Sequence, residues 1–180
     1  MRTMTAALLT LLLASGAQAQ EWKKKYKTVH EQAYEGLFLV TGADYTFGFV
    51  DEKTGEEVIA PKYQTAGVFA NGLANVALNK KHGFIDRTEK VVIPLIYDDS
   101  RGFSEGMAKV NLGAKGVEGM GLGGGTWGCI DPTGKVVIPI KYRVVEHPSE
   151  GMIGVRENAK CGFIDLTGKS FSTIDPLSID

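Results

Sequence analysis

A short phrase that recurs four times limits what this chain can fold into more than any other feature. It reads Gly-Phe-Val-Asp at 48–51, Gly-Phe-Ile-Asp at 83–86, Gly-Cys-Ile-Asp at 128–131 and Gly-Phe-Ile-Asp at 162–165. The first three copies run into a short Val/Ile stretch that ends near a proline. Each following unit opens with a glycine and an apolar residue, at Gly72, Gly106 and Gly151. The isoleucine of the Val/Ile stretch lies 13 residues before that opening glycine each time. Tandem copies with a constant offset are the signature of a repeat protein, in which each unit packs against its neighbours.

Each unit predicts three short β-strands. An opening Gly-apolar pair leads into alternating apolar and polar residues, as in 73–77, which is typical of a half-buried strand. The Gly-Phe-Ile-Asp phrase gives the second strand. The Val-Val-Ile-Pro stretch gives the third, closed by a proline that cannot donate to a ladder. We predict an all-β fold of four tandem repeats of about three short antiparallel strands forming an open β-repeat array. A closed barrel or a small propeller-like arrangement is the alternative.

The repeat domain is predicted at 35–180, in units of about 35–70, 71–104, 105–149 and 150–180. Residues 20–34 form a basic lead with four lysines between 23 and 27, which we expect to be a short helix or a loose, solvated tail. In the fourth unit, Ser-Phe-Ser-Thr at 170–173 stands where Val-Val-Ile-Pro is expected. Such a degenerate and more polar unit is expected of a terminal cap.

Residues 1–19 predict a secretory signal peptide, with Arg2, an apolar core at 6–14 and an Ala-x-Ala site cleaved after about Ala19. The apolar run is too short to span a membrane. Removal of this segment lowers the Lys plus Arg count from 20 to 19 against 21 acidic residues, for a net charge of −2. A near-neutral chain lacks the basic field that nucleic-acid binding needs. We therefore expect a periplasmic or secreted protein without a membrane span or a nucleic-acid partner.

The recurring aspartates Asp51, Asp86, Asp131 and Asp165 each open a tight turn. An aspartate at this place accepts hydrogen bonds from turn amides, and a glycine three or four residues later supplies the positive φ that closes the turn. We therefore interpret these carboxylates as turn caps rather than as paired catalytic acids. The second copy has Glu89 in place of the glycine, so Glu89 is predicted to adopt a positive φ.

These phrases together resemble the WG-repeat (KWG-type) family over residues 35 to about 174. Its units carry a Glu-Gly-Leu opening, a Trp-Gly-Phe-Ile-Asp strand, a Thr-Gly-Lys turn and a Val-Ile-Pro-Pro-x-Tyr end. The resemblance implies an all-β repeat array, often in exported or surface-associated bacterial proteins, that serves as a binding or scaffolding surface. It implies no shared enzymatic activity and no universal ligand. Only Trp127 keeps the signature tryptophan, because Phe47, His82 and Cys161 occupy the other three places.

Cys129 and Cys161 are the chain's two cysteines. They occupy the Phe position of the third copy and the Trp position of the fourth, which share a face of a strand with period two. An exported compartment permits a disulfide, so this pair is a disulfide candidate. The alternative is two small thiols that fill aromatic sites.

Tyr63, Tyr97 and Tyr142 recur at one equivalent position after the third strand. An exposed row of these rings would stack on sugars or grip a protein. The alternative, which we favour, is that they pack between successive units. We also expect the glycine before each Phe to leave room for a neighbour's ring.

The third unit carries a glycine-rich insertion at 113–125, which predicts a flexible hairpin extension. The string Gly-Met-Gly-Leu-Gly-Gly at 119–124 fits a dinucleotide-binding pattern, but that chemistry needs a strand-to-helix junction that is not expected here. His30, His82 and His147 show no metal-ligand spacing, and no nucleophile signature is present. We therefore expect no enzyme, no cofactor and no metal.

The sequence therefore predicts an exported, non-catalytic binding module of the bacterial envelope. The expected partner is another envelope or secreted protein. Two alternatives remain, a cell-wall or glycan binder and a periplasmic immunity protein that inhibits a toxin. The insertion at 113–125 is the expected place of individual specificity, because loops carry function on repeat scaffolds.

Overall fold

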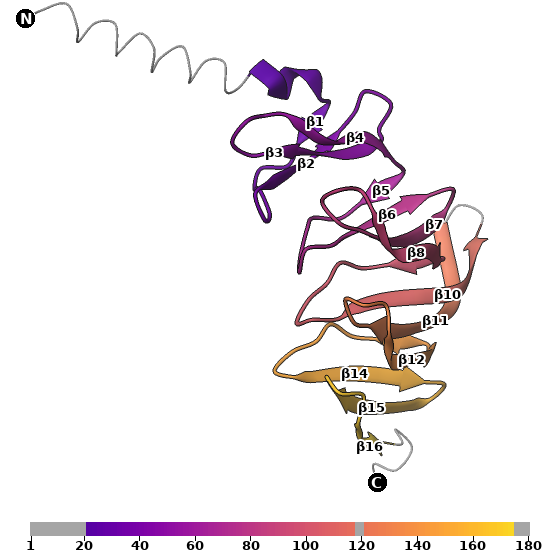
Figure 1. Cartoon of the computed structure of the whole chain (residues 1–180). Coiled ribbons are helices and arrows are strands. Elements are labelled where there is room, and N and C mark those ends of the chain that lie inside the picture. The colour runs from indigo at the N-terminus through magenta and orange to yellow at the C-terminus, as the bar shows by residue number, and fades with distance from the viewer. Residues whose placement is uncertain (1–20, 118–120, 175–180) are drawn as a thin grey trace, which may run out of the picture. The chain divides into compact units, whose positions relative to one another are not determined.

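The computed structural model describes residues 21–117 and 121–174 (Figure 1). Two compact units make up the chain, Met1–Ala66 and Gly67–Asp180, a division that the sequence did not indicate. The predicted signal peptide lies outside the described residues. Within the described ranges, no helix is long and apolar enough to cross a membrane.

The first unit is a sheet that incorporates the basic lead. Its elements are η1 (Trp22–Lys25), β1 (Thr28–Val29), β2 (Leu37–Thr41), β3 (Phe47–Asp51), β4 (Glu57–Tyr63) and β5 (Thr65–Ala66). Strands β1 to β4 form an antiparallel sheet in chain order. Trp22 of the 3-10 helix packs on Phe38, with ring centroids 5.8 Å apart, and Tyr26 is buried. The lead therefore forms the predicted short helix and covers one side of the first sheet, rather than hanging free as a tail.

The second unit holds the remaining strands. They are β6 (Ala74–Leu78), β7 (Lys81–Ile85), β8 (Val91–Tyr97), β9 (Asp99–Ser100), β10 (Ala108–Val117), β11 (Gly121–Ile130), β12 (Val136–Tyr142), β13 (Val144–Val145), β14 (Met152–Glu157), β15 (Lys160–Asp165) and β16 (Ser170–Ile174). Across the described residues, the strands form four antiparallel sheets of four, in the orders β1-β2-β3-β4, β5-β6-β7-β8, β12-β11-β10-β9 and β13-β14-β15-β16. The predicted all-β repeat array is confirmed.

Each sheet has four strands where about three were predicted. In the first sheet the additional strand is β1 of the lead, and in the other three it is a two-residue segment after the recurring tyrosine of the preceding unit, namely β5, β9 and β13. The sheets consequently start near residues 65, 99 and 144, ahead of the opening glycines that were expected to begin the units. The sequence did not reveal these strands, because two residues are too few to show a period of two.

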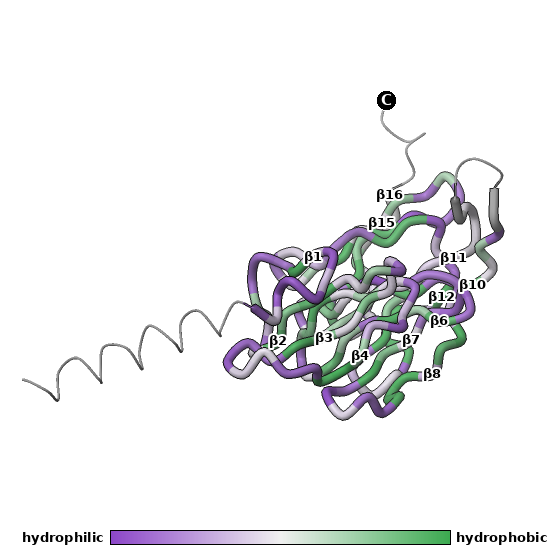
Figure 2. Tube along the Cα trace, turned by 90° about the horizontal axis from the view of Figure 1, so that it is seen from above, coloured by the Kyte–Doolittle hydropathy of each residue, from purple (hydrophilic) through white to green (hydrophobic). Residues whose placement is uncertain are grey.

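Successive sheets of the second unit pack through the Phe and Ile of the repeated phrase, whose side chains point to opposite faces. We call the face that carries Phe84 the forward face and the face that carries Ile85 the backward face. Phe84 and Ile93 of one sheet form a buried cluster with Ile130 of the next. Cys129 and Ile138 do the same with Ile164. Figure 2 shows apolar residues following the strands while polar residues occupy many connections. The core is therefore a series of two-sheet interfaces.

The glycines of the first three phrases are required by backbone packing, and not by a neighbour's ring as predicted. A Cβ on Gly48, Gly83 or Gly128 would lie 2.5, 2.6 and 2.5 Å from the carbonyl oxygens of Ile59, Ile93 and Ile138, respectively. The register between the second and third strands shifts at this point, which brings the two backbones together. Any side chain at these three positions would collide with the main chain of the adjacent strand.

The turn aspartates act as caps, as predicted. Asp131 Oδ1 accepts hydrogen bonds from the amides of Thr133 (2.9 Å) and Lys135 (3.0 Å) and from the Thr133 hydroxyl (2.6 Å). Asp86 and Asp165 make the same three bonds in their own turns. The turn glycines Gly134 and Gly168 have φ of 86° and 88°, and Glu89 has φ of 66° at the equivalent place. The predicted positive φ of Glu89 is thus confirmed.

Replacing Glu89 by glycine is expected to stabilise the protein by about 1 kcal/mol, because glycine adopts a positive φ without the Cβ penalty. The matched control is Glu89→Ala, which removes the same carboxylate but keeps the Cβ. Chemical denaturation of both variants separates the two effects. Equal stability of the two variants would show that the backbone at residue 89 is unstrained.

The turn aspartates also predict how stability depends on pH. Hydrogen bonds from the threonine hydroxyl, and then from turn amides, lower the pKa of Asp86, Asp131 and Asp165 below the ordinary 3.8. Above pH 3.8 these groups are ionised whether folded or not, so their stabilisation is fully present there. Below pH 3.8 the aspartates of the unfolded state bind protons before those of the folded state. The free energy of unfolding therefore falls with pH until the pH is below the pKa of the aspartates in the folded state.

We therefore expect the melting temperature to fall steeply as the pH drops below about 3.8, and to fall less steeply in the triple Asp→Asn variant at these positions. Melting followed by circular dichroism between about pH 6 and pH 2 measures both slopes. A triple variant with the slope of the parent chain would contradict the capping account.

Candidate functional site

The recurring tyrosines do not form an exposed row. Tyr63 and Tyr97 are 4% and 5% exposed, and Tyr142 is half-buried. Burial raises the pKa of Tyr97, as expected for a phenol packed among apolar groups. Each ring lies opposite the residue at the signature tryptophan position, with Tyr63 on Phe47, Tyr97 on His82 and Tyr142 on Trp127. Packing is therefore their role, and a sugar cannot stack on Tyr63 or Tyr97.

The two cysteines are free thiols, so the disulfide candidate Cys129–Cys161 is not formed. Cys129 is buried on the forward face of the third sheet, next to Ile138 and Ile164. Cys161 is exposed on β15. The shared-face argument assumed that the two positions meet between units, whereas the forward face of the third sheet contacts the backward face of the fourth, which carries Ile164 and not Cys161.

Thiol titration should give two thiols per chain under denaturing, non-reducing conditions but one rapidly reacting thiol in the folded protein. Cys161 supplies the fast thiol because it is exposed. Cys129 is slow because burial raises its pKa to about 11, which suppresses the reactive thiolate. A count of zero free thiols in the denatured protein would show that Cys129 and Cys161 do form a disulfide.

The glycine-rich insertion forms the predicted hairpin, but its two strands are paired where a flexible extension was expected. Strands β10 and β11 pair from Ala108↔Ile130 out to Val117↔Gly121. Residues 118–120 lie outside the described residues, and with them the start of the dinucleotide-like string. Its remaining residues, 121–124, lie within a β-strand. The pairing skips Gly113 and Gly125, whose φ values are 82° and 67°, so the insertion begins at a local irregularity of the ladder.

A hollow of about 230 Å³ lies at this irregularity, and we call it the hairpin hollow. Three glycines and an alanine build part of its wall, and its other groups are polar or aromatic. The lining residues are Asp99, Asn111, Ala114, Gly123, Gly124, Gly125, Trp127 and Arg143. A Cβ on Gly125 would lie 2.3 Å from Asn111 Oδ1, so the space exists only because position 125 is glycine.

The hollow is built on one row of residues that face each other across strands. Asp99, Asn111, Trp127 and Tyr142 are successive cross-strand partners on β9, β10, β11 and β12. The equivalent row of the second sheet contains Ala77, His82 and Tyr97. Asn111 thus stands where the second sheet has an alanine, which shows that the fold itself does not need a polar group at this place.

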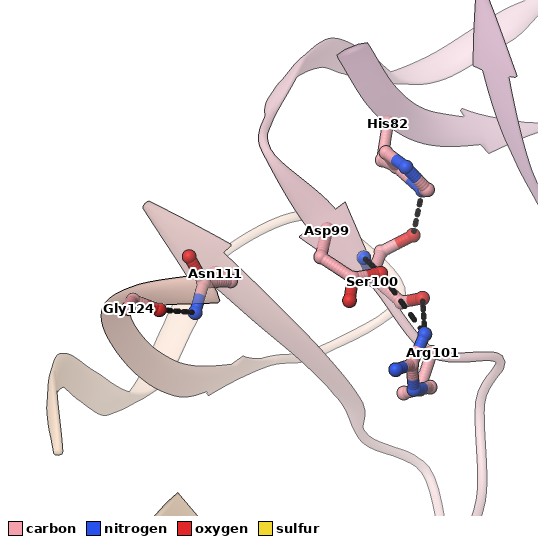
Figure 3. A network of polar contacts seen from close by, with 6 residues as sticks. All are labelled: His82, Asp99, Ser100, Arg101, Asn111 and Gly124. Atoms are coloured by element: carbon pink, nitrogen blue, oxygen red, sulfur yellow. Dashed lines mark hydrogen bonds and ion pairs between the residues drawn. The ribbon is translucent and has the colours of Figure 1, made fainter. Parts of the chain in front are cut away.

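Asn111 is the least satisfied polar residue of the hollow. Its side chain is 1% exposed, its Nδ2 donates to the Gly124 carbonyl at 3.4 Å, and its Oδ1 has no hydrogen-bond partner in the described structure (Figure 3). A buried acceptor left unpaired costs about 1–3 kcal/mol. A group from outside that donates to Oδ1 would recover this energy, so Asn111 singles out the hollow as a candidate site.

The charged rim of the hollow is held by a second polar network. Asp99 Oδ1 accepts from the Arg101 guanidinium at 2.9 Å and from the Ser100 amide at 2.7 Å, and the Ser100 hydroxyl lies 3.4 Å from His82 Nδ1 (Figure 3). The Arg101 guanidinium also lies over the Trp127 ring, 5.7 Å from its centroid. Burial lowers the pKa of His82, so its ring is neutral near pH 7. His82 therefore positions the rim and contributes no charge.

Among the described residues, no group of three or more His, Cys, Asp or Glu side chains is arranged to hold a metal ion. The hairpin hollow was not predicted, although the insertion at 113–125 that borders it was singled out as the expected place of specificity. Asn111, Asp99 and Arg143 were not predicted, since each lies on a strand or connection that looks ordinary in sequence. One signal was present, because Asn111 is a polar residue at a place where the second repeat has Ala77.

Comparison with known protein families identifies the repeats of this sequence. The family described as WG containing repeat matches residues 47–81, 83–115 and 127–161, which together exceed half of the chain. No curated protein sequence matches the chain.

Similar solved structures include the computationally designed Ika8 protein, with a TM-score of 0.50 and 11% identity over 80% of this chain. A second is BamB from Moraxella catarrhalis, with a TM-score of 0.43 and 15% identity over 78% of this chain. A third is the WD40 β-propeller domain of Doa1, with a TM-score of 0.37 and 18% identity over 81% of this chain. The chain spans about half the length of these solved chains, at 48%, 46% and 53%. The likeness concerns the fold alone, in which four-stranded antiparallel sheets follow one another as in propellers.

Proposed function

The chain belongs to the WG-containing repeat family, and on that premise we propose that it is an exported, non-catalytic binding module of the bacterial envelope whose partner is another envelope or secreted protein. The binding site of this proposal is the hairpin hollow together with the hairpin that borders it. Repeat arrays commonly bind through surfaces and loops added to a rigid scaffold, while the repeated core provides only stability.

The single observation that carries this proposal is the unpaired Oδ1 of Asn111, a residue that lines the hollow. A loop of a partner protein that inserts a backbone amide, a hydroxyl or a lysine would donate to it. Asp99 and Arg143 on the rim offer one acceptor and one donor group to the rest of that loop. A buried polar contact surrounded by weaker rim contacts is the arrangement that gives interfaces their specificity.

A glycan is the second candidate ligand, favoured by one observation. The hollow of about 230 Å³ combines the Trp127 ring with an amide, a carboxylate and a guanidinium, which suit the apolar face and the hydroxyls of one sugar ring. The sugar site of this alternative is the hairpin hollow, and it does not involve the buried tyrosines.

The test is capture from an envelope extract divided into soluble protein and purified cell wall. The bait is residues 20–180 and two variants. The first variant replaces 113–125 by the Asn-Lys turn that closes the shorter equivalent hairpin, where Asn79 and Lys80 follow Leu78. The second is Asn111→Ala, which copies Ala77 of the second sheet. The control is Lys53→Ala, an exposed change in the first unit.

We expect the parent chain to retain one stoichiometric protein, both hollow variants to lose at least about tenfold in affinity, and Lys53→Ala to behave as the parent. Asn111→Ala should melt at or above the parent temperature, because it removes a buried acceptor without a partner. Retention by cell wall alone would favour the glycan. Equal capture by all four baits would contradict the site.

A further inference from the structure

Two polar groups in the lining of the hairpin hollow lack a partner within the described residues. Asn111 Oδ1 accepts no hydrogen bond there, although Asn111 is only 1% exposed. The exposed Arg143 guanidinium makes no hydrogen bond and no ion pair with the described part of the chain. The first group is an acceptor that lacks a donor, and the second is a cation that lacks an anion. A ligand that completes both carries an N–H or O–H close to an acidic group.

The charges around the hollow also favour an acidic ligand. Its charged lining residues are Asp99 and Arg143. The Asp99 carboxylate is neutralised by the Arg101 guanidinium, 2.9 Å from its Oδ1. Lys109, two residues before Asn111 on β10, donates its Nζ to the Val145 carbonyl at 3.1 Å. The charge of Arg143 is therefore left over in the lining, and a guanidinium binds carboxylates and phosphates through two parallel hydrogen bonds.

The size of the hollow restricts the ligand to about one amino-acid residue. Its volume is about 230 Å³, whereas pockets for drug-sized ligands have roughly 300–1,000 Å³. The last residue of a polypeptide carries an N–H and a carboxylate on the same carbon atom. It also brings one chain through the mouth of the hollow, whereas an internal loop brings two. A C-terminal residue therefore supplies both missing groups in the smallest volume.

The wall beside Asn111 can give way to a main-chain N–H. A Cβ on Gly125 would lie 2.3 Å from Asn111 Oδ1, so this oxygen lies against the glycine wall. The hydrogen bond from Asn111 Nδ2 to the Gly124 carbonyl is long, at 3.4 Å, and is lengthened further at little cost. Gly124 and Gly125 have no side chains that resist a small shift of their backbone. Such a shift opens Oδ1 to an incoming donor.

We propose that the hairpin hollow captures the C-terminal residue of the partner protein. The α-carboxylate of that residue binds the Arg143 guanidinium, its N–H donates to Asn111 Oδ1, and its side chain packs on the Trp127 ring. This inference rests on the proposed function, in which a protein partner occupies the hollow, and adds which part of that protein enters. An internal segment of the same sequence has no carboxylate at this place and leaves Arg143 unpaired, so the hollow distinguishes chain ends from loops.

N-acetyl-alanine is the smallest probe, because it carries the N–H and the carboxylate of a C-terminal residue. We expect it to bind residues 20–180 with a dissociation constant of about 1–10 mM. Nuclear magnetic resonance of isotope-labelled protein measures this through the Asn111 side-chain amide and the Trp127 indole N–H. N-acetyl-alaninamide lacks the carboxylate, and N-acetyl-N-methylalanine lacks the N–H. Each should bind at least about tenfold more weakly, and equal binding of either overturns the proposal.

Variants of the protein test the same two contacts. Arg143→Gln and Asn111→Ala should each weaken the binding of N-acetyl-alanine at least about tenfold. The control is Arg87→Gln, which removes an exposed arginine from the connection between β7 and β8 and should bind as the parent does. Circular dichroism checks that all three variants are folded. Unchanged binding in Arg143→Gln would contradict the assignment of the carboxylate to that guanidinium.

Three further probes represent the other acidic ligands. Glucuronic acid carries its carboxylate on a sugar ring, inorganic phosphate is an anion without an N–H, and the N-acetyl methylamide of aspartate represents an internal acidic residue. We expect each to bind more weakly than N-acetyl-alanine. Tighter binding of any one of them overturns the proposal in favour of an acidic glycan, a simple anion or an acidic loop, respectively.

The captured partner separates a failure of this inference from a failure of the proposed function. Treatment of the partner with a carboxypeptidase should abolish its capture by the parent chain. Capture that is lost in Asn111→Ala but survives the carboxypeptidase overturns the chain-end inference and leaves the proposed function in place. Capture that is equal in the parent chain and in Asn111→Ala overturns both. If the extract holds no partner, binding of the three alanine probes decides the inference.

Discussion

Burial of the forward-face side chains of the second and third sheets under the next sheet is the interaction on which the second unit depends. Phe84 and Ile93 meet Ile130, and one sheet later Cys129 and Ile138 meet Ile164. A four-stranded sheet of five-residue strands is too small to bury a core alone. Each sheet is stable because its neighbours cover it, which makes stability a sum of nearest-neighbour interfaces. The outer faces of the first and the last described sheet have no neighbouring sheet, so their apolar side chains need another cover or stay exposed.

The ends are dealt with in different ways. The basic lead covers the backward side of the first sheet with Trp22 and Tyr26. The last described sheet keeps two exposed phenylalanines instead. Between them, the third sheet carries the features that the repeat does not explain, namely a longer hairpin, a hollow partly walled by glycines and a buried amide with an unpaired oxygen. Repetition supplies the scaffold, and the departures from repetition are where binding is proposed.

The repeated phrases were sufficient to predict the all-β array, the aspartate-capped turns and the positive φ of Glu89, because these depend on local residue types and constant spacing. Features that depend on contacts between units were missed. The two-residue strands are too short to show a pattern, and the pairing of Cys129 with Cys161 failed because opposite faces of neighbouring sheets meet. The glycines of the first three phrases were correctly singled out but for the wrong cause, since a backbone carbonyl and not a ring occupies the space. Asn111 looked like an ordinary strand residue until its burial was known.

The central claim is best tested by making one substitution at two equivalent positions. Phe84→Ala should cost about 3–5 kcal/mol in the free energy of unfolding, because Phe84 is fully buried under the next sheet. Phe163→Ala should cost less than about 1 kcal/mol, because Phe163 is 48% exposed and no sheet of the described residues covers it. Chemical denaturation of the two variants under identical conditions provides the comparison. Equal losses at both positions would contradict an array held together by forward-face burial.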